Sequence, residues 1–184
     1  MIHLYCGDGK GKTTAAIGLA VRAAGRGLPV LFVQFMKNAS AGELAPLEKL
    51  GVKILRGKCG SHFFSQMTED EKKETKRLCD ENLSFVMQYI HHIPEGRETD
   101  GVENIQHPSA LLVLDEICAA CHYGLIDSAS VDSLFSSLPA QVEAVLTGRN
   151  PMPLFLEKAD YITEMKKIRH PYDRGQKARR GVEF

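Results

Sequence analysis

The chain opens with a strand that runs directly into a glycine-rich loop and a helix. Its first fourteen residues read Met-Ile-His-Leu-Tyr-Cys-Gly-Asp-Gly-Lys-Gly-Lys-Thr-Thr. The apolar run that ends at Cys6 is typical of a buried parallel strand, and three glycines in the next five positions stop regular pairing. Such glycines let successive N–H groups turn inward at the start of a helix, where they can bind phosphate oxygens. The stretch therefore predicts a phosphate-binding loop, or P-loop.

The end of this loop carries the side chains that a nucleoside triphosphate needs. Lys12 can reach the β- and γ-phosphates, and the Thr13 hydroxyl is placed to hold a bridging magnesium ion. The usual spacing, G-x-x-x-x-G-K-[ST], has its first glycine where this chain has Cys6, so we expect a more compact loop. The alternative is a glycine-rich turn that binds nothing. The predicted ATP-binding residues are Gly7, Asp8, Gly9, Lys10, Gly11, Lys12, Thr13 and Thr14.

Length and composition favour one domain and exclude several classes of protein. The 184 residues fit a single domain, 1–184, that buries a sizeable core without disulfides or metals. Acidic and basic side chains balance at 23 each, so we expect no general attraction to nucleic acid or membrane. Five scattered cysteines argue against a disulfide framework. With no apolar run of membrane-spanning length and no signal-peptide pattern, we expect a cytoplasmic protein.

Apolar patterning predicts alternating strands and helices. Helices are expected over about 12–24, from 42, from Thr68 to about Ile90 after a capping box, across 118–121 and over 151–158. Strands are expected at 28–35, 52–55, 111–115 and 142–147, with an edge strand at 161–165 and a surface connection at 94–107. This order predicts an α/β fold, a three-layer P-loop NTPase (RecA-like) domain. Its sheet is mostly parallel with helices on both faces, and an antiparallel edge is possible near residue 161.

A second motif supports a nucleotide site. The apolar strand Leu-Leu-Val-Leu-Asp ends in Asp115 and is followed by Glu116, which is the Walker B pattern. Such an acid holds magnesium directly or through water beside the P-loop. The alternative is an ordinary strand whose terminal Asp caps the next helix. Arg149, just beyond the strand at 142–147, is positioned to reach phosphate oxygens.

Two further features leave alternatives open. Phe63 and Phe64 are adjacent aromatics within an irregular stretch, which indicates either a loop pinned to the core or a binding role. Cys118 and Cys121 have the spacing of a redox pair or half a zinc site. Because no second Cys pair has ligand spacing and the intervening residues are alanines, we expect both to be small core residues.

The combination of these motifs resembles one known family. The matching stretches are 7–16, 32–37, 112–116, 147–149 and the tail from His170 to Phe184. Read alone, the basic stretch 166–180 would predict a solvated or RNA-touching tail. Together the matching stretches resemble the ATP:corrinoid adenosyltransferases of the CobA, CobO and BtuR type, over nearly the whole chain.

The resemblance implies a reaction. The cobalt(I) of a corrinoid, either cobalamin or cobyrinic acid a,c-diamide or cobinamide, attacks the 5′ carbon of ATP and releases triphosphate, in adenosylcobalamin biosynthesis or salvage. ATP is then the co-substrate and Mg²⁺ or Mn²⁺ the cofactor. The implied catalytic residues are Lys12, Thr13 and Arg149, the metal-binding residues are Thr13, Asp115 and Glu116, and the corrinoid-facing residues are Phe63 and Phe64.

The resemblance also implies partners. It implies a homodimer and a reductase or flavodoxin-type electron donor, with no nucleic acid and no membrane. Relatives cover the active site with an extra N-terminal helical segment. Here the basic tail, 166–184, is expected to pack on or near the active site, or the partner subunit to close it.

Two other functions remain open from the residues. One is a P-loop ATPase or phosphotransferase in which Glu116 activates a water or hydroxyl. The other is a nucleotide- or corrinoid-binding regulatory module. The complete set of Lys12, Thr13, Asp115 and Glu116 argues against it, because binding alone does not require a complete magnesium site.

Overall fold

A computed structural model describes residues 1–37, 41–58, 60, 63–93 and 108–183. Among these, six strands form one sheet, flanked by helices. The strands are β1 (Ile2–Cys6), β2 (Val30–Gln34), β3 (Lys53–Arg56), β4 (Ala110–Asp115), β5 (Val142–Thr147) and β6 (Tyr161–Glu164). The helices are α1 (Lys12–Ala24), α2 (Leu44–Lys49), α3 (Glu69–His91), α4 (Ile117–His122), α5 (Ser128–Ser137) and α6 (Pro153–Lys158), with 3-10 turns η1 (Phe64–Gln66) and η2 (Pro171–Arg174).

The sheet has the order β3-β2-β4-β5-β1-β6, and every pair of neighbours is parallel. The prediction of an α/β P-loop fold with a mostly parallel sheet is therefore confirmed. The possible antiparallel edge near residue 161 was wrong. Because α6 returns the chain to the start of β1, the edge strand β6 runs in the same direction, with His3 opposite Tyr161.

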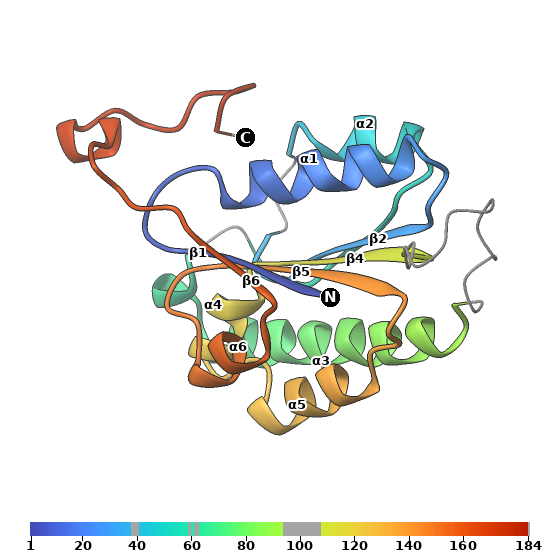
Figure 1. Cartoon of the computed structure of the whole chain (residues 1–184). Coiled ribbons are helices and arrows are strands. Elements are labelled where there is room, and N and C mark those ends of the chain that lie inside the picture. The colour runs from blue at the N-terminus through green and yellow to red at the C-terminus, as the bar shows by residue number, and fades with distance from the viewer. Residues whose placement is uncertain (38–40, 59, 61–62, 94–107, 184) are drawn as a thin grey trace.

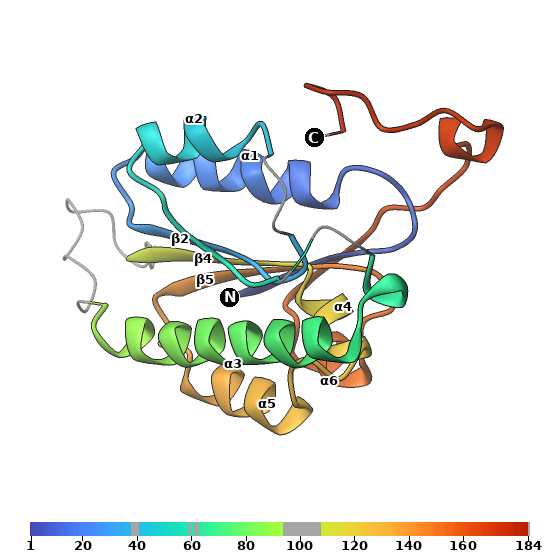
Figure 2. The ribbon, with the colours of Figure 1, turned by 180° about the vertical axis from the view of Figure 1, so that it is seen from behind.

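Helices cover both faces of this sheet, so the molecule has three layers (Figure 1 and, from behind, Figure 2). Helices α1 and α2 lie on one face, and α3 to α6 lie on the other. Alternate side chains of each strand point to opposite faces, so β2 sends Phe32 toward α1 and Leu31 and Val33 toward α3. Both faces are consequently apolar, as a buried parallel sheet requires.

Local capping signals mark the N-termini of α3 and α5. The predicted capping box of α3 is present, because Thr68 accepts the Glu71 N–H while the Glu71 carboxylate accepts the Thr68 N–H. Helix α5 was missed by the sequence analysis, since its serine-rich sequence has weak helix propensity. Its available signals were the Asp127 cap and buried Val131, Leu134 and Phe135 at helical spacing.

The predicted surface connection at 94–107 lies outside the described residues. Within the described part of the chain, none of the helices is long and apolar enough to cross a bilayer.

Candidate functional site

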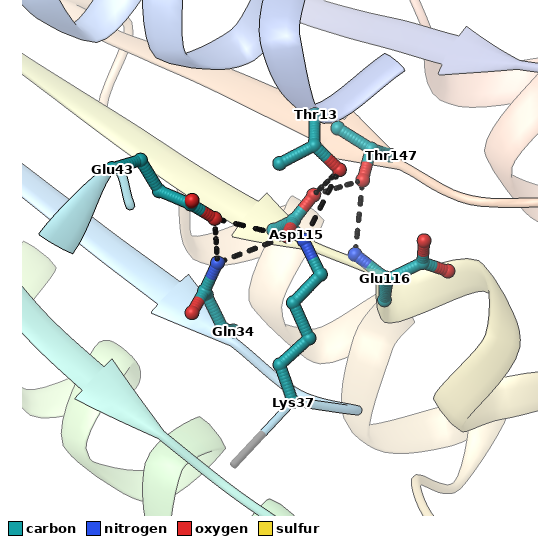
Figure 3. Close-up of polar contacts among 7 residues, drawn as sticks. All are labelled: Thr13, Gln34, Lys37, Glu43, Asp115, Glu116 and Thr147. Carbon is teal, nitrogen blue, oxygen red and sulfur yellow. Dashed lines mark hydrogen bonds and ion pairs between the residues drawn. The ribbon is translucent and has the colours of Figure 1, made fainter. Parts of the chain in front are cut away.

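The carboxyl ends of the central strands bring the predicted site residues to one end of the sheet. The P-loop follows β1, Asp115 ends β4, and Arg149 lies two residues beyond β5. Ligands of open α/β folds bind outside these strand ends. Residues separated by more than a hundred positions in the sequence thus form one polar cluster around Asp115 (Figure 3).

The P-loop turns into α1 through Gly11, whose φ of 118° is a left-handed value that side chains rarely adopt. The next residue, Lys12, is buried, and its Nζ donates to the Gly9 carbonyl at 2.7 Å. Burial lowers the pKa of Lys12, Glu116 opposes that change, and Arg149 adds to it. Lys12 is therefore held inside the loop, where a phosphate group would find a preorganised cation.

The first two loop glycines pack against the segment that follows β6. The Gly9 N–H donates to the Met165 carbonyl at 2.6 Å, and a Cβ on Gly7 or Gly9 would lie 2.6 or 2.5 Å from that oxygen. A side chain at either position would displace backbone. Besides its predicted role in anion binding, the glycine spacing thus has a packing cause. That cause is contact with a segment more than 150 residues away.

Two charged loop residues also contact the C-terminal part of the chain. Asp8 accepts the Lys167 N–H at 2.9 Å, and this hydrogen bond is the main reason that the pKa of Asp8 is lowered. Lys10 Nζ lies 3.0 Å from Glu183 Oε1 and 3.2 Å from the Val182 carbonyl. Both residues were predicted to bind ATP, and in this structure they hold the tail beside the P-loop.

Asp115 is fully buried and lies at the centre of the cluster. Its Oδ1 accepts the Thr13 hydroxyl at 2.8 Å and the Thr147 hydroxyl at 2.7 Å. Its Oδ2 lies 3.0 Å from Lys37 Nζ and 3.4 Å from Gln34 Nε2. A buried carboxylate requires such donors and a nearby cation, because burial without them is costly.

No individual role was predicted from the sequence for four residues of this cluster, namely Gln34, Lys37, Glu43 and Thr147. Glu43 accepts from Gln34 Nε2 at 3.1 Å and lies 3.9 Å from Lys37 Nζ. The available signal was a polar residue at the carboxyl end of an otherwise apolar strand, which describes both Gln34 and Thr147.

Glu116 lies beside Asp115 but points elsewhere. Its backbone is left-handed, with φ 62°, and its N–H donates to Thr147 Oγ1 at 2.9 Å. The carboxylate extends away from Asp115 (Figure 3). Burial raises the pKa of Glu116 and the neighbouring Asp115 raises it further, whereas Lys37, Lys12 and Arg149 lower it.

The donor set around Asp115 fits a hard divalent cation. A carboxylate and a hydroxyl are oxygen ligands, which Mg²⁺ prefers, and Mg²⁺ commonly takes one or two protein carboxylates and completes its shell with water and substrate phosphates. Within the described ranges, His, Cys, Asp and Glu side chains form no group of three or more suited to a metal. Asp115 and Thr13 offer two oxygen ligands to such a cation.

Arg149 is exposed at the edge of the cluster. It follows Gly148, whose φ is 148° and whose Cβ would lie 2.5 Å from Cys118 Cβ, so glycine is needed to pass α4. The guanidinium is near enough to act on the pKa of both Lys12 and Glu116. This exposed position leaves the Arg149 guanidinium accessible to an anion.

The two predicted aromatics differ in environment. Phe64 is half-buried and stacks on Tyr123, with ring centroids 4.3 Å apart, and it packs against the main apolar cluster. Phe63 is 78% exposed. Phe64 therefore fastens the loop to the fold, and Phe63 is left at the surface.

Cys118 and Cys121 are buried in the main apolar cluster, as expected of small core residues. Burial raises the pKa of Cys121 to about 12 and also raises the pKa of Cys118. Thiols of this kind are poor nucleophiles and poor metal ligands.

Two hollows lie near opposite ends of the strands. The larger, about 590 Å³, is mostly apolar and lies at the amino ends, where Met1, His3 and Tyr161 line it. The smaller, about 260 Å³, is lined by Thr13, Lys37, Glu43 and residues 181–183 of the tail. The smaller hollow adjoins the end of the P-loop, where Thr13 and Thr14 line it.

Comparison with known proteins gives one consistent result. The family model described as "ATP:corrinoid adenosyltransferase BtuR/CobO/CobP" matches residues 1–184. The corrinoid adenosyltransferases of Pseudomonas aeruginosa and Escherichia coli strain K12 are each 31% identical to the chain. All of the chain is matched in both cases, together with 83% and 85% of the respective relatives. A corrinoid adenosyltransferase from Sinorhizobium is 32% identical over all of the chain and 80% of its own length. The chain belongs to the ATP:corrinoid adenosyltransferase family, a family of transferases.

Proposed function

We propose that this protein transfers the 5′-deoxyadenosyl group of ATP to the cobalt(I) of a corrinoid. The electron pair of cobalt(I) forms the cobalt–carbon bond, and the C5′–O bond breaks with its electrons passing to the released triphosphate. The main structural support for this reaction is that Lys12, Asp115 and Arg149 lie together at one end of the sheet. Membership of the family supports the same reaction.

The reaction asks little of the protein beyond alignment and charge stabilisation. Cobalt(I) has no proton to lose, so a general base is unnecessary, and the task is to hold ATP and to stabilise its leaving group. Lys12 presents a buried cation at the loop, and Arg149 presents an exposed one just beyond β5. In this proposal the P-loop binds the group that leaves.

We further propose that Thr13, Asp115 and Glu116 hold Mg²⁺ or Mn²⁺ in the loaded enzyme. Thr13 and Asp115 already touch, at 2.8 Å, and both offer oxygen ligands. When bound, the metal supplies Lewis-acid stabilisation of the departing phosphate oxygens. Glu116 points away from Asp115, so its role as a direct ligand requires a rotation of its side chain.

Phe63 is proposed as the residue that faces the corrinoid. An exposed aromatic next to an anchored one offers an apolar surface at a fixed position, because Phe64 and Tyr123 hold the loop. An apolar side chain under the ring favours removal of the lower axial ligand, which makes cobalt(I) easier to form.

The C-terminal tail is proposed to cover the nucleotide. Its residues 181–183 line the hollow beside Thr13 and Lys37, and Glu183 pairs with Lys10 of the loop. A homodimer, an electron donor of the reductase or flavodoxin type and a cytoplasmic location are further parts of the proposal. They rest on the family resemblance and on the need to supply cobalt(I).

An anaerobic assay with chemically reduced cob(I)alamin, magnesium and ATP tests the reaction. We expect a light-sensitive adenosylcobalamin and one triphosphate per product, both lost in Lys12→Ala. Lys76→Ala, which changes a lysine on the exposed face of α3, should behave as wild type. ADP and phosphate with an unchanged corrinoid spectrum would instead favour the ATPase or phosphotransferase, with Glu116 as its base.

A further inference from the structure

Lys37 directly contacts the two side chains that are proposed to hold the metal. Its Nζ lies 3.0 Å from Asp115 Oδ2 and 3.4 Å from Thr13 Oγ1 (Figure 3). Lys37 follows β2 by three residues, and β2 is the neighbour of β4 in the sheet. The strand order therefore brings this ammonium to the carboxylate.

The Lys37 ammonium offsets the cost of burying the Asp115 carboxylate. Asp115 is fully buried, and a buried carboxylate is stable only with a cation and hydrogen-bond donors close by. The Lys12 ammonium is hydrogen-bonded to the Gly9 carbonyl, whereas Lys37 forms an ion pair with Asp115. Lys37 thus supplies the positive charge that a metal would otherwise bring.

Lys37 and a divalent cation cannot share these ligands at low cost. A metal held by Asp115 and Thr13 would be bound through the oxygens of the same two side chains that the Lys37 ammonium now contacts. An ammonium touching the same two residues would then be within a few ångströms of two positive charges, where repulsion is strong in a partly buried site. One of the two cations must leave, unless anionic ligands lie between them.

A triphosphate can provide those anionic ligands. The Lys37 side chain is about one-third exposed (32%), and it lines the hollow between the P-loop and Glu43. The ammonium can therefore move from Asp115 toward phosphate oxygens without leaving the site. Glu43 Oε1 lies 3.9 Å from Nζ at the same hollow.

We propose that Lys37 competes with the divalent metal for Asp115 and Thr13, and that a bound triphosphate ends this competition by taking the ammonium. Metal binding then depends on nucleotide, and the metal enters with ATP. This inference rests on the proposed function only in taking Asp115 and Thr13 as the metal ligands. Lys37 is in this proposal a binding residue that couples two binding events.

Metal binding to the nucleotide-free protein tests the first half. Mn²⁺ affinity is measured by calorimetry or electron paramagnetic resonance for wild type, Lys37→Met and the control Lys76→Met. Lys76 pairs with Asp80 at 2.9 Å on the exposed face of α3. We expect Lys37→Met to bind Mn²⁺ at least tenfold more tightly than wild type, and Lys76→Met to match wild type. Adding Asp115→Asn to Lys37→Met should remove the gain.

Binding of inorganic tripolyphosphate in the absence of metal tests the second half. We expect Lys37→Met to bind it at least tenfold more weakly than wild type, since the ammonium is a phosphate ligand in this state. Lys37→Gln repeats both measurements with a polar side chain, and circular dichroism checks that each variant is folded.

Three results of the Mn²⁺ measurements would overturn the proposal for Lys37. Equal Mn²⁺ affinity in wild type and a folded Lys37 variant, or no Mn²⁺ binding by the variant, would overturn the inference. A gain that survives Asp115→Asn would overturn it too, because the metal would then bind elsewhere. Failure to form adenosylcobalamin would refute the proposed reaction while leaving these binding results intact.

Discussion

Thr147 Oγ1 lies 2.7 Å from Asp115 Oδ1, and the same hydroxyl accepts the Glu116 N–H at 2.9 Å. One side chain of β5 thus fixes the end of β4 and the start of α4. The contact follows from the strand register. Leu114 of β4 pairs with Leu146 of β5, and the next residues of these strands are Asp115 and Thr147. Thr147 sets the orientation of the carboxylate without needing to touch substrate.

Thr147→Val keeps the shape of the side chain and removes the hydroxyl. Asp115 then loses a donor and the Glu116 N–H loses its acceptor, so we expect a loss of about 1–3 kcal/mol in the free energy of unfolding. Urea denaturation measures this change, and Thr147→Ser, which keeps the hydroxyl, should recover most of it. Equal stability of the Val variant and wild type would show that the hydroxyl is dispensable.

Gly9→Ala tests whether the P-loop glycines are needed for packing. A Cβ there would lie 2.5 Å from the Met165 carbonyl oxygen, so we expect the variant to lose about 1–3 kcal/mol of stability and to bind ATP more weakly. Gly18→Ala is the matched control, because its Cβ meets nothing within 4 Å. In the interior of α1 that change should stabilise the protein by up to about 1 kcal/mol. A Gly9 variant as stable as wild type would contradict the close contact.

Local signals allowed most of the fold to be predicted. The apolar runs of β2, β4 and β5, the glycine spacing and the Thr68 capping box each depend on neighbours in sequence. The rest of the site depends on which strands are adjacent. Lys37 reaches Asp115 because β2 lies beside β4, and Gly9 needs to be glycine because of Met165, and neither fact can be read from a single stretch.

The direction of β6 is another feature that its own sequence could not predict. Its sequence allowed either an antiparallel or a parallel edge, and the choice was made by α6, which returns the chain to the start of β1. Tertiary contacts decided the strand's direction where local pattern could not.

The buried thiols should make the protein sensitive to alkali. The pKa of Cys121 is raised from 9.0 to about 12 in the folded state, so between these values the folded protein holds a proton that the unfolded chain has lost. Stability should therefore fall as pH rises above about 9. Urea denaturation at pH 7.5, 9 and 10 measures the fall, and Cys118→Ala/Cys121→Ala should show a shallower one. A slope unchanged in the double variant would contradict the assignment.

The same burial predicts protection from alkylation. At pH 8.5 the native protein should leave the peptide with Cys118 and Cys121 unmodified by iodoacetamide, while unfolded protein is modified at both, as mass spectrometry can show. Rapid modification of Cys118 or Cys121 in the native protein would instead favour a redox role for this pair.

Substitutions at Phe63 and Phe64 should separate an effect on activity from an effect on stability. Phe64→Ala removes the stacking on Tyr123 and half-buried apolar area, so we expect a loss of about 1–2 kcal/mol in unfolding free energy. Phe63 is 78% exposed, so Phe63→Ala should leave thermal stability within about 0.5 kcal/mol of wild type. If Phe63 faces the corrinoid, that variant should nevertheless form adenosylcobalamin at least tenfold more slowly. Phe63→Leu, which retains apolar area, should recover part of the rate. Full activity of the folded Phe63→Ala protein would move the corrinoid surface elsewhere.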